Sequence, residues 1–202
     1  MSSSVFSKET SIIVLSKDDI AVANVVVTLT PKVEKEYTAP EELAIMDQVD
    51  TQFLPHILIV QQDSRVIFPN SDSIKHHVYS FSTAKTFELQ LYKDLRAEPL
   101  LFSNTGIVEL GCNIHDWMLG YIFVADTPYF AKTDLHGKVI LDVPEGEYVL
   151  KVWNPRFQEK EEVLTLNMTV PKEGSMIVKL NNDLLPDLSD YEQSADEFSD
   201  YE

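Results

Sequence analysis

The chain carries one short segment that is rich in metal-ligating side chains, Gly111-Cys112-Asn113-Ile114-His115-Asp116-Trp117-Met118. Within it, Cys112, His115 and Met118 follow the spacing Cys-x2-His-x2-Met, which brings a thiol, an imidazole and a thioether close together. These donors of graded softness suit copper, which cycles between a soft cuprous and a harder cupric state. Two histidines, one cysteine and a weak axial methionine make the blue-copper arrangement. The segment therefore predicts a mononuclear copper site that needs one further histidine.

Apolar, β-branched runs lie on both sides of this ligand segment. Residues 107–110 predict a strand that leads into it, and residues 120–124 predict a strand that leads out. Two paired strands would hold a tight ligand loop and restrain its geometry. Met118 would take the axial position, where a long, weak bond helps to set the reduction potential. Asp116 would add a carboxylate close to copper, and its charge would favour the cupric state.

The order of these motifs resembles the cupredoxin family over about residues 43–126. The resemblance is carried by Phe53-x-Pro55, Val60, Val66-Ile67-Phe68-Pro69-Asn70, the pair His76-His77 and the cysteine segment. The short ligand segment is most similar to that of amicyanin. The wider pattern, which includes Asp126-Thr127-Pro128-Tyr129-Phe130, resembles the cupredoxin-like proteins known as methylamine utilization proteins. This resemblance implies a Greek-key β-sandwich that binds one copper ion, and it implies export to the periplasm.

Two adjacent histidines compete for the place of the upstream ligand. In plastocyanin-like cupredoxins the ligand lies six residues after the Asn that ends the preceding strand, which gives His76. Counting back from Phe81 by the family's His-x3-Phe gives His77 instead. We favour His76, because the length of the loop into the site is the firmer constraint. The other histidine is expected beside the metal, where it would hydrogen-bond the loop or the sulfur.

The predicted ligand set is thus His76, Cys112, His115 and Met118. Seen singly, a buried cysteine is usually a small hydrophobic residue and a methionine fills a core. The spacing and the flanking strands together favour metal binding over that interpretation. The remaining histidines, His56 and His136, are expected at the surface and in a turn.

Outside the ligand segment, nearly every apolar run is short and rich in Val, Ile, Phe or Tyr, and turn residues separate the runs. Many short strands at this spacing indicate an all-β protein with sandwich architecture. The expected strands are residues 11–15, 25–29, 57–60, 66–68, 78–81, 107–110, 121–124, 139–141, 148–152 and 163–166. Residues 40–47 alone have a helical pattern, with Pro40 first and acidic residues in the first turn.

A second sandwich is expected from the two ends of the chain. Residues 133–153 alternate with period two and break at Pro144-Glu145-Gly146, which predicts a hairpin with one apolar face. Together with residues 12–15 and 22–29, they resemble the carboxypeptidase regulatory-like domain, a small β-sandwich of the transthyretin or immunoglobulin-like type. We expect this discontinuous domain over residues 11–42 and 127–181, with the cupredoxin domain, residues 43–126, inserted. The alternative is one larger β-domain.

The charge of the chain is strongly acidic, with a formal net charge of −17. Such a balance disfavours nucleic acid and anionic membranes, and it favours a partner protein with a basic patch. Residues 1–10 are expected to be disordered. The acidic tail, residues 182–202, is also expected to be disordered, because from Asp183 onward it has eight acidic residues and no basic one. It either solubilises the protein or docks a basic partner.

The function that these features favour is one-electron transfer by a type 1 copper protein. The alternatives are a copper-binding or copper-delivery module without a redox role, and a β-sandwich interaction protein with an unoccupied site. An enzyme is not expected, because the sequence has no paired His-x-His motifs, Ser/His/Asp elbow or Gly-rich phosphate loop. No transmembrane segment or signal peptide is visible, so a cytosolic location stays open beside the periplasmic one. The single cysteine cannot form an intramolecular disulfide.

Overall fold

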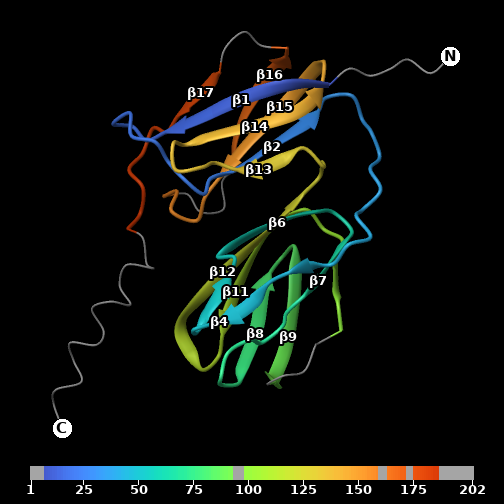
Figure 1. Cartoon of the computed structure of the whole chain (residues 1–202), viewed down its shortest axis with the longest axis vertical. Coiled ribbons are helices and arrows are strands. Elements are labelled where there is room, and N and C mark those ends of the chain that lie inside the picture. The colour runs from blue at the N-terminus through green and yellow to red at the C-terminus, as the bar shows by residue number, and fades with distance from the viewer. Residues whose placement is uncertain (1–6, 93–97, 159–162, 172–174, 187–202) are drawn as a thin grey trace.

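A computed structural model of the chain describes residues 7–92, 98–158, 163–171 and 175–186. Two β-sandwiches are stacked along the long axis of the molecule (Figure 1). We name the two sandwiches by their place in the sequence. The outer sandwich is built from both ends of the chain, and the middle sandwich is built from the residues between them. The described residues form strands and no helix, which confirms the all-β prediction. The described residues therefore contain no candidate for a membrane-spanning helix.

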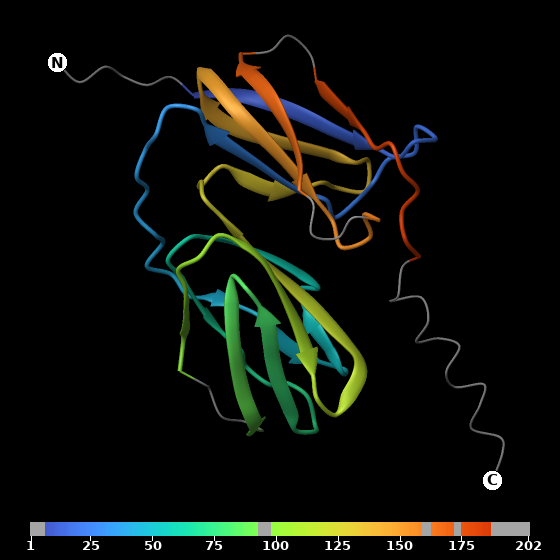
Figure 2. The same cartoon turned by 180° about the vertical axis from the view of Figure 1, so that it is seen from behind.

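The outer sandwich combines strands from the two ends of the chain in both of its sheets. The three-stranded sheet has the order β14 (Lys138–Pro144), β1 (Ser7–Leu15), β17 (Met176–Lys179). The four-stranded sheet has the order β13 (Phe130–Lys132), β2 (Val26–Pro31), β15 (Gly146–Trp153), β16 (Leu164–Val170). Strand β1 pairs antiparallel with β14 and parallel with β17. The first described strand is therefore held between two of the last five (Figures 1 and 2).

The predicted hairpin over residues 133–153 is wrong. Strand β14 pairs with β1, whereas β15 pairs with β2 and β16 in the other sheet. Alternation with period two shows that each strand has one apolar face, but it does not show which neighbour completes the backbone pairing. Here the apolar faces of β14 and β15 meet across the core, where Val139 and Leu141 join Leu150 and Val152 in one buried cluster.

The middle sandwich contains a five-stranded and a three-stranded sheet, with a separate strand pair. The five-stranded sheet has the order β6 (Ile57–Gln61), β12 (His115–Ala125), β11 (Gly106–Cys112), β8 (His76–Ser82), β9 (Lys85–Tyr92). The three-stranded sheet has the order β10 (Leu100–Phe102), β7 (Ser64–Ile67), β3 (Ala44–Ile45). Strands β4 (Asp47–Val49) and β5 (Gln52–Leu54) pair with each other. A buried cluster that includes Phe53, Phe68, Val78, Phe102 and Ile122 fills the space between the sheets.

Residues 40–47 do not form the short helix that was predicted. They hold β3 and the start of β4, and β3 pairs in parallel with β7. Met46 is fully buried, and its amide donates a hydrogen bond to the carbonyl of Ile67 at 3.0 Å. A proline and acidic residues favour a helix start only locally. Burial of Met46 in the core outweighs that weak preference.

A third apolar cluster joins the two sandwiches. Trp153 and Val26 of the outer sandwich pack against Ile57, Tyr121 and Phe123 of the middle one. The Trp153 ring lies 5.6 Å from the ring of Tyr121 and 5.8 Å from that of Phe123, measured between centroids. All these side chains are buried. The outer sandwich therefore covers part of one face of the five-stranded sheet.

The ends of the chain are ordered further than the sequence predicts. Strand β1 begins at Ser7, within the stretch expected to be disordered, because residues 7–10 pair with β14. Near the other end, Leu185 makes two hydrogen bonds with Arg156. The amide of Leu185 donates to the carbonyl of Arg156 at 2.7 Å, and the carbonyl of Leu185 accepts from Arg156 Nε at 2.8 Å. Residues 1–6 and 187–202 lie outside the described part of the chain.

We propose that residues 43–126 are an inserted domain, and limited proteolysis tests this. The first crossing between the sandwiches, residues 32–43, has exposed residues over 32–36 and no strand (Figure 2). The second crossing is anchored, because Thr127 Oγ1 donates to the Leu29 carbonyl and Asp126 is paired with Lys151. We expect the first cut in residues 32–36, followed by a resistant fragment close to 43–126. Fragments that never include this core would contradict insertion and favour one larger domain.

Candidate metal centre

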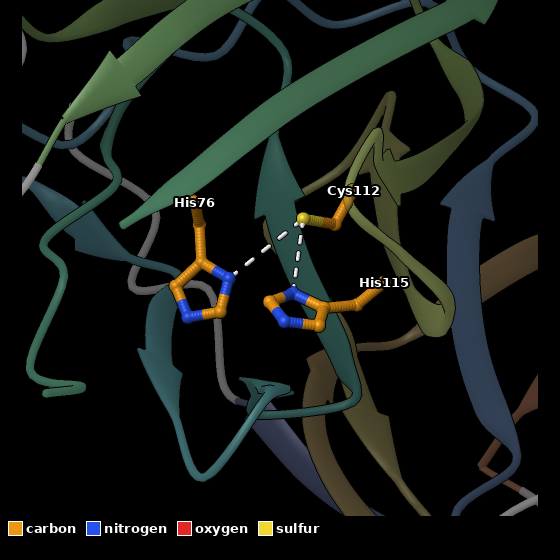
Figure 3. Close-up of side chains that lie close together, drawn as sticks. All are labelled: His76, Cys112 and His115. Atoms are coloured by element: carbon orange, nitrogen blue, oxygen red, sulfur yellow. Dashed lines mark hydrogen bonds between the residues drawn. The ribbon is translucent and has the colours of Figure 1, made fainter. Parts of the chain in front are cut away.

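Three side chains from three strands converge at one end of the middle sandwich (Figure 3). His76 begins β8, Cys112 ends β11 and His115 begins β12. Their potential ligand atoms all lie within 4.8 Å of one another. Cys112 Sγ lies 3.7 Å from His76 Nδ1 and 3.6 Å from His115 Nδ1. Both imidazoles thus present the same ring nitrogen to the sulfur.

Backbone pairing fixes the position of the cysteine. Cys112 pairs with His115 across a two-residue turn and with Val78 of β8 on its other side. The turn is attached to β8 as well, since the amide of Asn113 donates to the carbonyl of His77 at 3.1 Å. The histidine strand and the cysteine turn are therefore held together by main-chain hydrogen bonds, which do not depend on a bound ion.

A β-bulge places Met118. The β11–β12 register shifts at Cys112: Gly111 pairs with Leu119 and Cys112 with His115, so residues 116–118 have no partner on β11. A bulge of this kind turns side chains to new directions. Met118 lies inside the same buried cluster as Cys112 and is 1% exposed, whereas Trp117 is 58% exposed. The side chain of Asp116, expected near the metal, lies outside the described part of the structure.

Burial is uneven around the site. His76 and Cys112 are buried, whereas His115 is partly exposed. The ring of Trp117 lies 5.5 Å from that of His115. The cluster is therefore open to solvent on the His115 side, whereas His76 and Cys112 are enclosed by the core.

Asp72 is the acidic residue that supports His76, and the sequence analysis did not single it out. Its Oδ2 lies 3.0 Å from His76 Nε2. The backbone amide of Thr51, then His76 and the amide of Ser73, lower the pKa of the Asp72 carboxyl to about 2, against the opposing effect of burial. A carboxylate at Nε2 favours the tautomer with its proton there, which leaves Nδ1 as a lone-pair donor toward Cys112.

The loop before β8 explains why Asp72 can reach His76. Asn70 Oδ1 accepts from the amide of Asp72 at 3.0 Å, and Asn70 Nδ2 donates to the carbonyl of Ile74 at 2.9 Å. Such an Asx turn compacts the loop. The signal in the sequence is the Asn-x-Asp pair just before His76, but only the folded loop shows that the carboxylate faces the imidazole.

The other histidines lie away from this cluster. His77 Nε2 lies 2.8 Å from Glu88 Oε1, so the expectation that its side chain contacts the ligand loop or the sulfur is wrong. Successive residues of a strand point to opposite faces, and only the carbonyl of His77 reaches the loop. His56 is exposed and lies against Tyr121, with ring centroids 5.5 Å apart. His136 is exposed in a turn.

The donor geometry fits a metal ion. With metal–sulfur bonds of about 2.3 Å, metal–nitrogen bonds of about 2.0–2.1 Å and angles of about 110–120°, sulfur and nitrogen lie about 3.6–3.8 Å apart. The two Sγ–Nδ1 distances, 3.7 and 3.6 Å, fall in this range. Two imidazoles and a thiolate with a buried thioether close by suit copper better than hard cations.

The chain resembles several solved structures at low sequence identity. No protein-family model and no curated protein matches the chain. A purple cupredoxin from Nitrosopumilus maritimus is 20% identical and covers 41% of this chain and 99% of its own, with a TM-score of 0.35. A reduced amicyanin variant is 21% identical over 48% of this chain and 99% of its own, with a TM-score of 0.37. A copper-containing nitrite reductase from Thermus scotoductus is 19% identical over 48% of this chain but only 26% of its own, with a TM-score of 0.41.

Replacing Asp72 by Asn tests its role through pH. The folded pKa of about 2 lies below the usual 3.8, so the carboxylate stabilises the fold above about pH 4, and this contribution is lost as the pH falls toward 2. We expect Asp72→Asn to lower the free energy of unfolding by about 1–2 kcal/mol at pH 7, and the difference from wild type to shrink below pH 4. Urea unfolding measures it. Asp142→Asn, an exposed carboxylate of the outer sandwich, is the control, and an equal loss there would contradict this role.

Replacing Gly111 by Ala tests the packing next to Cys112. A Cβ at this position would lie 2.7 Å from Cζ of Tyr79. The two atoms would overlap at this distance, so the Tyr79 ring would have to move. We expect Gly111→Ala to destabilise the fold by about 1–3 kcal/mol. Adding Tyr79→Ser should recover part of this loss, because the ring that collides is gone. Strict additivity of the two changes in urea unfolding would show that the ring is not the obstacle.

Proposed function

We propose that this protein binds one copper ion through His76, Cys112, His115 and Met118, and that it carries single electrons between redox partners. The observation that carries the proposal is the pair of imidazole Nδ1 atoms at 3.6–3.7 Å from one buried thiol. Met118 supports it, since the bulge buries this thioether in the same cluster as Cys112. The distant likeness of motif order to cupredoxins is consistent with the same conclusion.

Each residue has a distinct part in this proposal. Cys112, His76 and His115 would hold the copper ion through a thiolate and two imidazoles, and Met118 would add a thioether donor. Asp72 holds His76 in the required tautomer. The paired strands β8, β11 and β12 restrain the donors, so that little rearrangement is needed when the charge of the site changes. Copper, when bound, would accept and return one electron at this position. Exchange would occur on the His115 side, where the enclosure is incomplete.

We favour a carrier over an enzyme because the described residues offer a single cluster of three or more metal-binding side chains. A reaction at copper needs an open ligand position or further metal ions. In the proposed site, Met118 would supply the fourth donor from the buried side. A delivery module without a redox role is the alternative, and it differs in what happens after copper binds.

The partner and the compartment complete the proposal. We propose a redox partner with a basic patch, because the net charge of −17 favours encounter with a positively charged surface. We place the protein in the periplasm, the compartment that its resemblance to cupredoxins implies.

Addition of cupric ion to the purified protein tests copper binding and redox function together. We expect an intense visible thiolate-to-copper charge-transfer band in the wild type and none in Cys112→Ser. The band should bleach with mild reductant and return with oxidant. Absence of a band in a folded wild-type protein would contradict the copper site. A band that does not cycle would favour delivery over electron transfer.

The adjacent histidines provide a matched pair of variants. His76→Ala should abolish the band, because it removes a donor 3.7 Å from the sulfur. His77→Ala should keep it, since that imidazole pairs with Glu88 on the other face. Circular dichroism of both variants checks that each is folded. The opposite result would make His77 the ligand and would overturn the site described above.

A further inference from the structure

The five-stranded sheet of the middle sandwich has an outer face that is only partly covered. The part near Tyr121 and Phe123 packs under Trp153 of the outer sandwich. Beyond it, the same face continues over β11, β8 and β9, where Tyr79 lies opposite both Gly111 and Glu88. We call Tyr79, Phe81 and Glu109 the uncovered face.

Two aromatic rings form the centre of the uncovered face. The rings of Tyr79 and Phe81 lie 5.2 Å apart between centroids, at an interplanar angle of 40°. Phe81, the next-to-last residue of β8, is 82% exposed, and it lies beside a second aromatic ring rather than singly on the surface. Tyr79 is supported from below, since its ring fills the space that a side chain at position 111 would need. The two rings thus form an aromatic platform, in which Phe81 is exposed and Tyr79 is half-buried.

The charge around the platform has one sign. A shallow groove of about 750 Å³ runs from Tyr79 and Phe81 to Tyr121 and Trp153. Of the described residues that line it, Glu109 is the one that carries a charge. Burial of the Tyr121 hydroxyl, and to a smaller extent the charge of Glu109, raise the pKa of Tyr121 to about 12. Glu88, beside Tyr79, is exposed and pairs with His77. Lys85, the first residue of β9, instead extends over the ring of Phe102 on the core side.

Exposed aromatic faces next to a carboxylate are a recognition surface for cations. Arginine and lysine side chains stack on such rings, and the attraction grows as water is excluded. A carboxylate at the edge adds a charged hydrogen bond to the same group. An anionic or purely apolar segment would leave the negative charge of Glu109 in the contact without a positive charge to balance it.

We infer that the uncovered face docks an arginine- or lysine-bearing segment of a basic partner protein. The net charge of −17 draws such a partner to the protein, and the aromatic platform then selects where it binds. None of the three residues is a donor of the proposed copper site, so docking does not need the metal. Its use for electron exchange rests on the proposed function, whereas the binding itself does not.

Nuclear magnetic resonance of the full-length, ¹⁵N-labelled chain tests this docking with the peptide acetyl-Gly-Arg-Gly-Arg-Gly-amide. About 0.15 M salt suppresses attraction over more than about 8 Å. We expect shifts of the amide signals of residues 79–81 and 109–111. A peptide with citrulline in place of arginine should bind at least about fivefold more weakly, because it keeps the shape but loses the charge. Equal binding of the two peptides, or shifts confined to other residues, would overturn the proposal.

A matched pair of double variants separates this face from general charge. Phe81→Ser/Glu109→Gln removes one exposed apolar side chain and one charge from the face. Leu135→Ser/Glu145→Gln removes the same from an exposed part of the outer sandwich. We expect the first to weaken peptide binding at least about fivefold and the second to bind as wild type does. Equal losses would assign the binding to overall charge and would contradict docking on the uncovered face.

A third variant and the copper band keep the outcomes distinct. Phe81→Leu retains an apolar side chain without a ring face, so it should also weaken binding if the ring holds the cation; unchanged binding would contradict the platform. Both double variants should keep the visible band. If no protein shows the band, wild type included, but the peptide results hold, then the copper function fails and the docking face stands.

Discussion

The arrangement of the site depends on the pairing of β11 with β8 on one side and β12 on the other. These main-chain hydrogen bonds bring a histidine, a cysteine and a second histidine from three strands to the same end of the sheet. Side-chain contacts then refine the positions: Asp72 orients His76, and the bulge after His115 turns Met118 inward. Because backbone pairing does this work, the positions of these three residues do not depend on a bound ion. In the proposed electron carrier, such preorganisation would keep the change of geometry on electron exchange small.

The second sandwich changes what the five-stranded sheet presents to its surroundings. Trp153 covers one part of the outer face, and the rest stays open around Tyr79 and Phe81. In the covered part, apolar side chains are buried in the contact between the two sandwiches. The open part keeps an aromatic platform of limited size. The outer sandwich therefore acts as a boundary that decides how much of this face a partner can reach.

The sequence was informative where partners are close along the chain and less so where they are distant. Cys112, His115 and Met118 could be grouped because residues so close together in the sequence stay close together in the fold. The all-β class followed from the short, alternating apolar runs. The choice between His76 and His77 depended on loop length, whereas the face that each occupies is a property of the strand. Asp72 was missed because its carboxylate meets His76 only through the folded Asx turn. The wrong hairpin and the wrong helix at residues 40–47 share one cause, since pairing with β1 and with β7 involves residues far away in sequence.

The interleaving of the outer sandwich has a consequence for how the chain acquires its structure during synthesis. Strands β1 and β2 leave the ribosome well before the strands they pair with, β13, β14, β15 and β17, which begin only at Phe130. The middle sandwich contains all its own pairing partners, so it can form while β1 and β2 still wait. Once formed, it brings the end of β2 close to the start of β13 and shortens the effective loop that the outer sandwich has to close. The middle sandwich is thus also the template on which the two ends of the chain meet.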